Sequence, residues 1–250
     1  MGNNDWIVLN HIIYQIHSME DLTRMRELLM EQLHILMDYD SADFWLSSPD
    51  GMNKLVEPVF HNESPIIEDI YMDNLYALDY AKGLLISGKN MIYRESDMIP
   101  DDQRVNTEFY KKYFEPAGWH HGLNLILGYR QKFLGVLAFY RDKGKPNFQY
   151  EDTFILEMLK DHLEYRIHKN WVEESQGEEK IRVAECTRRY GLTRREETIL
   201  EHLLQSEDND VICKQLYITN NTLKKHILNL YQKMEVSSRM QLFKKVKEVR

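Results

Sequence analysis

The chain has 250 residues, of which 43% are hydrophobic, and this is enough apolar material for one or two packed domains. Its longest apolar run, residues 133–140, is far shorter than the roughly 18–20 residues that span a bilayer. Only two cysteines occur, Cys186 and Cys213, which excludes a disulfide scaffold and zinc sites built on paired thiolates. The N-terminus has neither a basic secretion signal nor a myristoylation motif, so we expect a cytoplasmic protein without a membrane anchor.

The net charge of −8 is distributed unevenly along the chain. Residues 1–170 hold 17 basic and 27 acidic side chains, whereas residues 181–250 hold 14 basic and 9 acidic ones. An acidic segment with few apolar residues lies between them and has the composition of a linker or an exposed helix end. We therefore predict two domains with different tasks, at residues 1–172 and 186–250, joined by a helical or flexible linker at 173–185.

Helical and strand patterns alternate in the first part of the chain. Leucines and methionines recur at helical spacing after Asp21, a residue type that caps helix N-termini. Pro116 and Gly118 are expected to stop a later helix, because proline disfavours helical geometry in the preceding residue and donates no hydrogen bond. The predicted elements are helices at 6–16, 21–38, 66–85 and 101–114, and strands at 41–47 and 55–60 joined by a turn at 48–51.

Beyond Gly118 the hydrophobic period changes from helical to strand-like. Residues 122–127 and 133–140 are apolar and rich in strand-forming types, and the polar segment 128–132 between them predicts a hairpin. A long helix is expected next, because apolar residues recur at steps of three and four from Ile155 to Trp171. These elements place a sheet at the centre of the first domain, with the helix leading toward the linker.

The order of these elements resembles a GAF sensor domain. The resemblance covers about 150 residues. It implies a central antiparallel sheet with helices packed on it and, in many members, a small-molecule pocket on the other face. The positions that carry it are Phe109, Tyr110, Tyr113 and Pro116, the strand at 133–137, and Phe148 with Asp152 before the long helix.

Large aromatic side chains are candidate walls of such a pocket, which we expect between the sheet and residues 66–99. The candidate ligand-binding residues are Trp45, Tyr76 and Trp119, because aromatic side chains with a polar tip suit a mostly apolar site. Aromatic residues at this density also build ordinary cores. A packed core without a ligand is therefore the alternative interpretation.

The C-terminal segment predicts a set of short helices with defined starts. Thr193 and Glu196 have the spacing of a capping box, in which each side chain binds the other residue's backbone N–H. A helix is expected from there to Leu204, a second one at 210–216, and a third one at 220–234 with Thr219 as its N-cap.

The third of these helices has the chemistry of a nucleic-acid contact. No acidic residue occurs between Val211 and Met234, whereas the segment contains lysines at 214, 224, 225 and 233. Leu223 and Leu230 mark a buried face on the opposite side. Two short helices joined by a turn, the second with a basic exposed face, fit the major groove of double-stranded DNA.

This segment resembles the LuxR-type helix-turn-helix, and the register runs without gaps over some 48 residues. The matching positions are Leu192, Thr193, Arg195, Glu196, Leu200, Ile212, Leu216, Ile218, Thr219, Thr222, Lys224, His226, Lys233, Val236, Ser238 and Arg239. The resemblance implies that the helix with Lys224 is the recognition helix. The candidate DNA-binding residues are Thr219, Asn221, Thr222, Lys224, Lys225 and Asn229. The sequence departs from the family at Glu235, where a Gly or Asn often ends the helix.

The two resemblances together predict an α+β fold. A GAF-like antiparallel sheet with packed helices precedes an all-α, four-helix LuxR-type domain. Our first hypothesis is a sequence-specific transcription regulator whose N-terminal domain senses a small molecule or a partner and controls the helix-turn-helix. A quorum-sensing autoinducer receptor is one alternative, although the Asp-Pro and paired-tryptophan pattern of acyl-homoserine-lactone pockets is missing. A helix-turn-helix that binds protein is another.

The remaining expectations concern partners and chemistry. Two apolar helix faces, one on 6–16 and one on 155–167, predict a homodimer, since an uncovered apolar face needs a partner. RNA polymerase is a further candidate partner. We expect no enzyme, because hydrolase, phosphate-loop and metalloprotease motifs are missing. We also expect no cofactor and no metal. His120 and His121 point to opposite faces of a regular strand, and no third ligand lies at a helpful spacing.

Overall fold

The computed structural model describes residues 2–48, 54–62, 78–85, 87–205 and 207–249. The chain forms two compact units, Met1–Trp171 and Val172–Arg250. Within the described residues, no helix combines the length and the apolar character that a membrane crossing requires.

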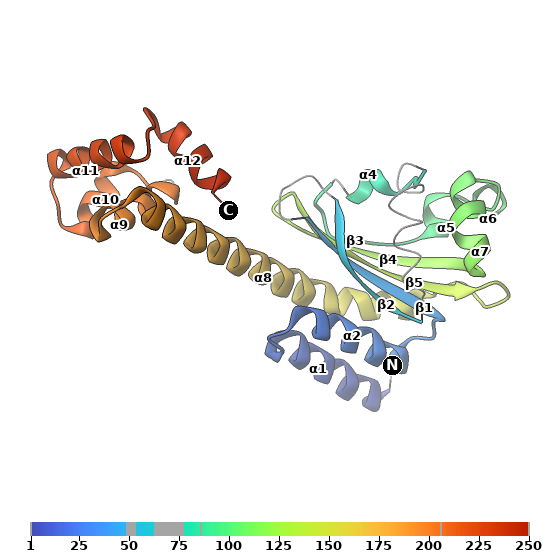
Figure 1. The fold of residues 1–250 in the computed structure, drawn as a ribbon. Helices are drawn as coiled ribbons and strands as arrows, with labels where there is room; N and C mark the ends of the chain where they lie inside the picture. Colours follow the sequence, from blue (N-terminus) through green and yellow to red (C-terminus); the bar gives the residue numbers. More distant parts are fainter. Residues whose placement is uncertain (1, 49–53, 63–77, 86, 206, 250) are drawn as a thin grey trace. The chain divides into compact units, whose positions relative to one another are not determined.

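Five antiparallel strands form the sheet of the N-terminal unit, in the order β2-β1-β5-β4-β3 (Figure 1). A two-residue turn joins β4 and β5, and both of its residues, Arg130 and Gln131, have the positive φ of a type I′ turn. The four strands predicted from the sequence are confirmed, and β3 is an additional one. The strands are β1 (Ser41–Ser47), β2 (Leu55–His61), β3 (Met91–Arg94), β4 (Trp119–Tyr129) and β5 (Lys132–Asp142).

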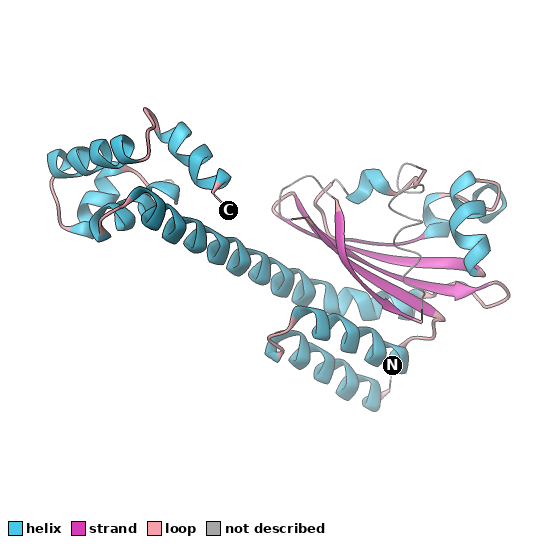
Figure 2. Ribbon diagram, viewed as in Figure 1, coloured by secondary structure: helices cyan, strands magenta, loops and turns pink. Residues whose placement is uncertain are grey.

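Both faces of the sheet are covered by helices (Figure 2). One face packs against α1 (Asn3–Ser18), α2 (Leu22–Leu36) and the first part of α8 (Tyr150–Tyr190). On the other face lie the short helices α4 (Lys82–Leu85), α5 (Glu95–Met98), α6 (Asp101–Arg104) and α7 (Glu115–Ala117). Alternate residues of β5 supply the two cores, with Leu137 and Phe139 on the first side and Val136, Ala138 and Tyr140 on the second.

The helix α8 begins at a buried ion pair. Arg141 of β5 donates to Asp152 at 3.1 Å, and both side chains are almost inaccessible to water. The same guanidinium donates to the Asp38 carbonyl oxygen at 2.8 Å and lies over the ring of Phe148. Asp152 also accepts from the backbone N–H of Gln149 at 2.7 Å, just before the helix starts. The ion pair therefore joins the central strand, the start of α8 and the end of α2.

The segment that we predicted as one helix at 101–114 is divided. The helix α6 ends at Arg104, and a π-helix, η2 (Tyr110–Phe114), runs directly into α7. Pro116 does not end the helix but lies in the first turn of α7, directly after the π-helix. Gly118 does end it, with a φ of 83° that favours glycine.

The two apolar helix faces from which we predicted a homodimer are covered inside the chain itself. Leu9 and Ile16 of α1 and Leu159, Leu163 and Ile167 of α8 are buried in the core beneath the sheet. That reason for a second copy is therefore wrong. Of the predicted helix at 66–85, residues 66–77 lie outside the described residues, and α4 is the part that is described.

Four short helices and the end of α8 form the C-terminal unit. They are α9 (Arg194–Leu204), α10 (Asn209–Leu216), α11 (Asn220–Lys233) and α12 (Arg239–Glu248). Their common core also contains Val183 and Cys186, which lie on α8. Residues 173–185, the predicted linker, are thus part of one 41-residue helix. Gly191 has a φ of 59° directly after this helix, a conformation that glycine adopts without strain.

The buried ion pair leads to a prediction about stability. Replacing Asp152 by Ala leaves the Arg141 charge buried without its carboxylate, which costs on the order of 3–5 kcal/mol in comparable sites. We expect the free energy of unfolding of the N-terminal unit to fall by about that amount. Urea titrations followed by tryptophan fluorescence measure it, because all four tryptophans lie within residues 1–171.

The exposed Asp161 on the same helix provides a matched control. Asp161→Ala removes the same charge and the same atoms but breaks no buried pair, so its effect should stay within about 0.5 kcal/mol. Equal effects of the two substitutions would contradict the role assigned to the ion pair.

Candidate functional site

The helices α10 and α11 form a helix-turn-helix. The turn between them is set by Tyr217, which adopts a left-handed conformation with a φ of 54°. Thr219 then caps α11, because its hydroxyl oxygen accepts from the backbone N–H of Thr222 at 3.2 Å. Asn220 donates to the Asp210 carboxylate at 3.0 Å and so joins the first turns of both helices. The turn at Tyr217 and the cap at Thr219 were both predicted.

A polar network fixes the start of α9 to the end of α11. The predicted capping box is present, since Glu196 accepts from the Thr193 backbone N–H at 2.8 Å. Lys233 donates to the same Glu196 carboxylate at 2.7 Å and to the Gly191 carbonyl oxygen at 2.9 Å. Burial opposes ionisation of Glu196, yet the hydrogen bond from Lys233 keeps the pKa of this carboxyl below its usual value. Lys233 is thus engaged within the protein.

Two arginines hold the other helix ends. Arg195 donates to the carbonyl oxygen of Leu216 at 2.8 Å, at the last residue of α10. Arg239 donates to the carbonyl oxygens of Leu203 and Glu207 at 2.7 and 3.1 Å, where α9 ends. Helix C-termini leave carbonyl groups without intrahelical partners, and a guanidinium satisfies them well.

The face of α11 opposite its buried residues Leu223 and Leu230 is exposed. Asn221, Thr222, Lys224 and Lys225 are exposed, and Asn229 is half-buried further along the helix. Among the described residues, neither lysine has an ion-pair partner, in contrast to Lys233. The structure therefore places the predicted DNA-binding residues on one helix and leaves both lysine ammonium groups accessible.

Exposed apolar residues accompany this face, and sequence reasoning missed part of them. Leu228 on α11 is 56% exposed, and Tyr217 at the turn is 95% exposed. Leu228 occupies a position that is a base-contacting residue in some family members, whereas nothing in the apolar pattern reveals that Tyr217, directly after α10, is so exposed.

A departure from the family pattern lies just after α11. Glu235 adopts a left-handed conformation with a φ of 51°, although the family usually has Gly or Asn at this helix end.

Comparison with known proteins agrees with this geometry. Residues 191–246 match the family described as bacterial regulatory proteins, luxR family. Residues 191–246, which contain the helix-turn-helix, thus match a luxR-family domain. An HTH-type transcriptional regulator in the exeN 3' region of Aeromonas salmonicida is 26% identical over 154 residues, covering 56% of this chain and 79% of that protein. The transcriptional regulatory protein YhcZ of Bacillus subtilis is 40% identical over 52 residues, or 21% of this chain and 24% of that protein.

A solved structure extends the likeness to the fold of the whole chain. SdiA of Escherichia coli superposes with a TM-score of 0.52 and 16% identity, covering 98% of both chains. SdiA has also been crystallised in complex with octanoyl-rac-glycerol, and that structure gives a TM-score of 0.50 at the same identity. The expected α+β fold, with a GAF-like sheet before a helical luxR-family domain, is confirmed.

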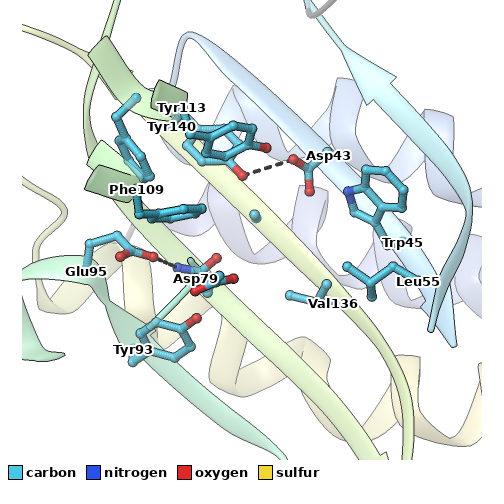
Figure 3. Close-up of a pocket in the computed structure, with 13 residues that line it drawn as sticks. Asp43, Trp45, Leu55, Asp79, Tyr93, Glu95, Phe109, Tyr113, Val136 and Tyr140 are labelled. Atoms are coloured by element: carbon cyan, nitrogen blue, oxygen red, sulfur yellow. Dashed lines mark hydrogen bonds between the residues drawn. The ribbon is translucent and has the colours of Figure 1, made fainter. Parts of the chain in front are cut away.

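The N-terminal unit has a cavity on the sheet face opposite α1 and α2 (Figure 3). Its volume is about 40 Å³, which is room for roughly three water-sized groups. Most of its walls are apolar or aromatic, whereas three carboxylates supply its acidic groups. The described residues that line it are Asp43, Trp45, Leu55, Asp79, Tyr93, Glu95, Phe109, Tyr113, Phe114, Asn124, Val136, Ala138 and Tyr140.

Two of the carboxyl groups are fully buried and ionise with difficulty. Burial raises the pKa of Asp43 to about 7, although hydrogen bonds from Tyr140, at 2.9 Å, and Trp45 favour its ionised form. Burial also raises the pKa of Glu95 to about 7, although hydrogen bonds from Tyr80 and Asn124 act in the opposite direction. The cavity thus changes its charge near neutral pH.

The three predicted ligand-binding residues have different positions. Trp45 lines the cavity, whereas Trp119 stacks on Tyr140 at 3.9 Å between ring centroids and lies one layer behind it. Tyr76 lies outside the described residues. Sequence reasoning missed Asp43 and Glu95, because isolated acidic residues in a sequence do not differ in pattern from exposed ones.

The raised pKa values predict how stability depends on pH. In the unfolded chain, Asp43 and Glu95 ionise near 3.8 and 4.5, whereas in the folded protein they ionise near 7. The folded state therefore binds more protons between these values, and stability present at pH 4 is lost as the pH rises through 7. Between pH 5 and 8, the free energy of unfolding of Asp43→Asn should therefore fall by roughly 2 kcal/mol less than that of the parent protein. Urea titrations at several pH values, followed by tryptophan fluorescence, measure it.

Asp102→Asn is the matched control, because Asp102 is exposed. It should leave the pH dependence of the free energy of unfolding as in the parent protein. If Asp43→Asn and the parent lose stability in parallel over this range, Asp43 is not a buried proton-binding group.

Proposed function

We propose that this regulator binds specific DNA sites through α11 and that its N-terminal unit controls this binding in response to a small molecule. The exposed Lys224 and Lys225, which pair with none of the described acidic groups, carry the first half of the proposal on an otherwise anchored helix. The second half is supported by the aromatic cavity with its buried carboxylates.

The two lysines have different roles in this proposal. Adjacent helical residues point about 100° apart, so both cannot face the groove floor. Lys224 contacts a base edge or the phosphate beside it, and Lys225 lies nearer to the phosphate backbone. Asn221 and Asn229 flank Lys225 at helical spacing, while the capping pair Thr219 and Thr222 lies near the backbone at the start of α11.

Binding titrations at several salt concentrations separate these roles. Lys225→Ala should weaken binding to operator and random DNA alike and reduce the slope of log affinity against log salt by about 0.9, because one fewer counterion is released. Lys224→Ala should mainly narrow the difference in affinity between operator and random DNA, because about 1–3 kcal/mol of binding free energy is lost at one base position of the operator.

Lys244→Ala is the matched control, since this exposed lysine lies on α12 and makes only a loose contact with Glu248. It should bind operator DNA with nearly the parent affinity. If the variants at Lys224 and Lys225 also bind like the parent, α11 is not the recognition helix.

The proposed organisation keeps the boundaries expected from the sequence, with a sensor at 1–172, a linker at 173–185 within α8, and a DNA-binding domain at 186–250. We also propose a homodimer and RNA polymerase as a further partner. The dimer is supported by exposed apolar residues on α1 and α8, since Ile7, Tyr14 and Tyr165 are 60–68% exposed. The contacts of Trp6 with Phe154 and of His17 with Tyr165 show that these helices lie side by side.

The chemistry of the cavity limits the proposed ligand. Its buried carboxylates suit a ligand with hydrogen-bond donors, and its aromatic rings suit an apolar part. The cavity holds only a small group, so we propose that the polar end of a ligand occupies it. The complex of SdiA with octanoyl-rac-glycerol supports a hydroxylated amphiphile as the first probe.

A thermal-shift titration with octanoyl-rac-glycerol tests this proposal, with methyl octanoate as a control that lacks the free hydroxyls. We expect only the hydroxylated compound to raise the melting temperature of the N-terminal unit, and Trp45→Ala to abolish the shift. Trp171→Ala, outside the residues that line the cavity, should preserve it. A shift that survives Trp45→Ala would place the ligand elsewhere.

An autoinducer receptor is the second candidate function. It is favoured by Asp79, a buried carboxylate that lines the cavity and accepts from the Ala81 backbone N–H at 2.7 Å. A carboxylate at this position suits the N–H donor of an amide-containing signal molecule. A helix-turn-helix that binds protein is less favoured, because accessible lysines on a recognition helix suit phosphate.

A further inference from the structure

A cluster of three potential metal ligands lies in the N-terminal unit, among residues that do not line the cavity. Asp101 comes from the first turn of α6, and His120 and His121 come from the start of β4. One ligand atom from each of the three residues lies within 4.8 Å of the other two. Segments separated by about 20 positions in the sequence thus meet at one point.

The two adjacent histidines share one site because β4 is irregular there. On a regular strand their side chains would point to opposite faces, which is the reason we gave against a shared metal. The pairing of β4 with β5 shifts between Trp119 and His121, however, and this allows the rings to approach. Their centroids are 4.5 Å apart with an angle of 79° between the planes. The regular-strand argument therefore fails at this position.

The hydrogen bonding of both rings suits coordination. His121 is 9% exposed, and its Nδ1 has no hydrogen-bond partner among the described residues. Nδ1 of His120 lies 2.8 Å from the Tyr110 hydroxyl, which orients this ring and leaves its Nε2 for a ligand bond.

A hydrogen-bonded arginine fixes the position of the Asp101 carboxylate. Arg104, whose side chain is fully buried, donates to one oxygen of Asp101 at 3.0 and 3.1 Å and to the His120 carbonyl oxygen. The second carboxylate oxygen is left for a cation. The guanidinium charge offsets that of Asp101, so we expect weaker binding than at a site with an unopposed carboxylate.

We propose that Asp101, His120 and His121 bind a divalent transition-metal ion of the zinc class. Two imidazole nitrogens and one carboxylate oxygen form a ligand set that Zn²⁺ accepts, with water in the fourth position. Tetrahedral ligand bonds of about 2.0–2.2 Å place ligand atoms roughly 3.3–3.6 Å apart, so atoms that now lie up to 4.8 Å apart must approach one another by up to about 1.5 Å to close the site.

The position of this site connects it to the cavity. Tyr110, which orients His120, is the first residue of η2, and Tyr113 and Phe114 of the same π-helix line the cavity. A bound metal would hold α6, β4 and η2 together. The proposal does not depend on the identity of the sensed ligand.

Isothermal titration of the metal-stripped full chain with Zn²⁺ tests the proposal. We expect one ion per chain and at least a tenfold loss of affinity in His120→Ala and in Asp101→Asn. His17→Ala is the matched control, because His17 and His162 form a second histidine pair at 2.9 Å. This control should bind Zn²⁺ with the parent affinity.

Visible absorption of the Co²⁺-loaded protein is a second readout, and circular dichroism reports whether each variant folds. Asp101→Asn is the variant of choice if His120→Ala is unfolded, since it preserves the shape of the side chain. It also removes the charge that pairs with the buried Arg104, so its circular dichroism must match that of the parent before the Zn²⁺ affinities are compared. Absence of stoichiometric Zn²⁺ binding would overturn the proposal. Equal Zn²⁺ affinity of the parent and Asp101→Asn would overturn it too, as would a loss confined to His17→Ala.

Discussion

One helix belongs to two hydrophobic cores, and the organisation of this chain depends on it. The first part of α8 buries Ile155, Leu159 and Leu163 beneath the sheet, and its last part buries Val183 and Cys186 among α9–α12. Helices in proteins owe most of their stability to the packing of an apolar face against the rest of the fold. The intervening turns contain the acidic segment, and its described residues belong to neither core. The two units are thus connected through backbone hydrogen bonds rather than through an unstructured linker.

Because helices cover both faces of the sheet, acidic side chains on its strands can be buried, and this changes their ionisation in the cavity. Asp43 lies on β1, a strand whose seven residues are all buried, so its carboxyl group has no access to bulk water. Hydrogen bonds from neighbouring side chains stabilise its charge only in part, and its pKa stays near neutrality. A buried group with a perturbed pKa in a cavity is typical of functional sites, although structural networks produce the same shifts.

Much of the fold could be predicted because its determinants are local. The capping box at Thr193, the cap at Thr219 and the hairpin at 128–132 each depend on a few neighbouring residues. The elements that were missed depend on partners far along the chain. β3 has four residues and forms by pairing with β4, and the π-helix at Tyr110 shows no signal in hydrophobic period.

The candidate sites divide in the same way. The basic face of α11 is visible in the sequence because charge and helical spacing are both local patterns. The acidic groups of the cavity and the proximity of Asp101 to His120 are set by tertiary structure and by an irregular strand pairing. Spacing rules for regular strands gave the wrong geometry for the two histidines, since the local register shift overrides them.

The helix-turn-helix separates the residues that hold it together from those that face outward on α11. Glu196, Lys233 and Arg239 bind backbone and side-chain groups within the domain, whereas Asn221, Lys225 and Leu228 project away from its core. Substitutions in the second group leave the internal network intact. If α11 reads DNA as proposed, operator preference can therefore diverge among descendants of such a protein at little cost in folding, and a new recognition specificity requires no new scaffold.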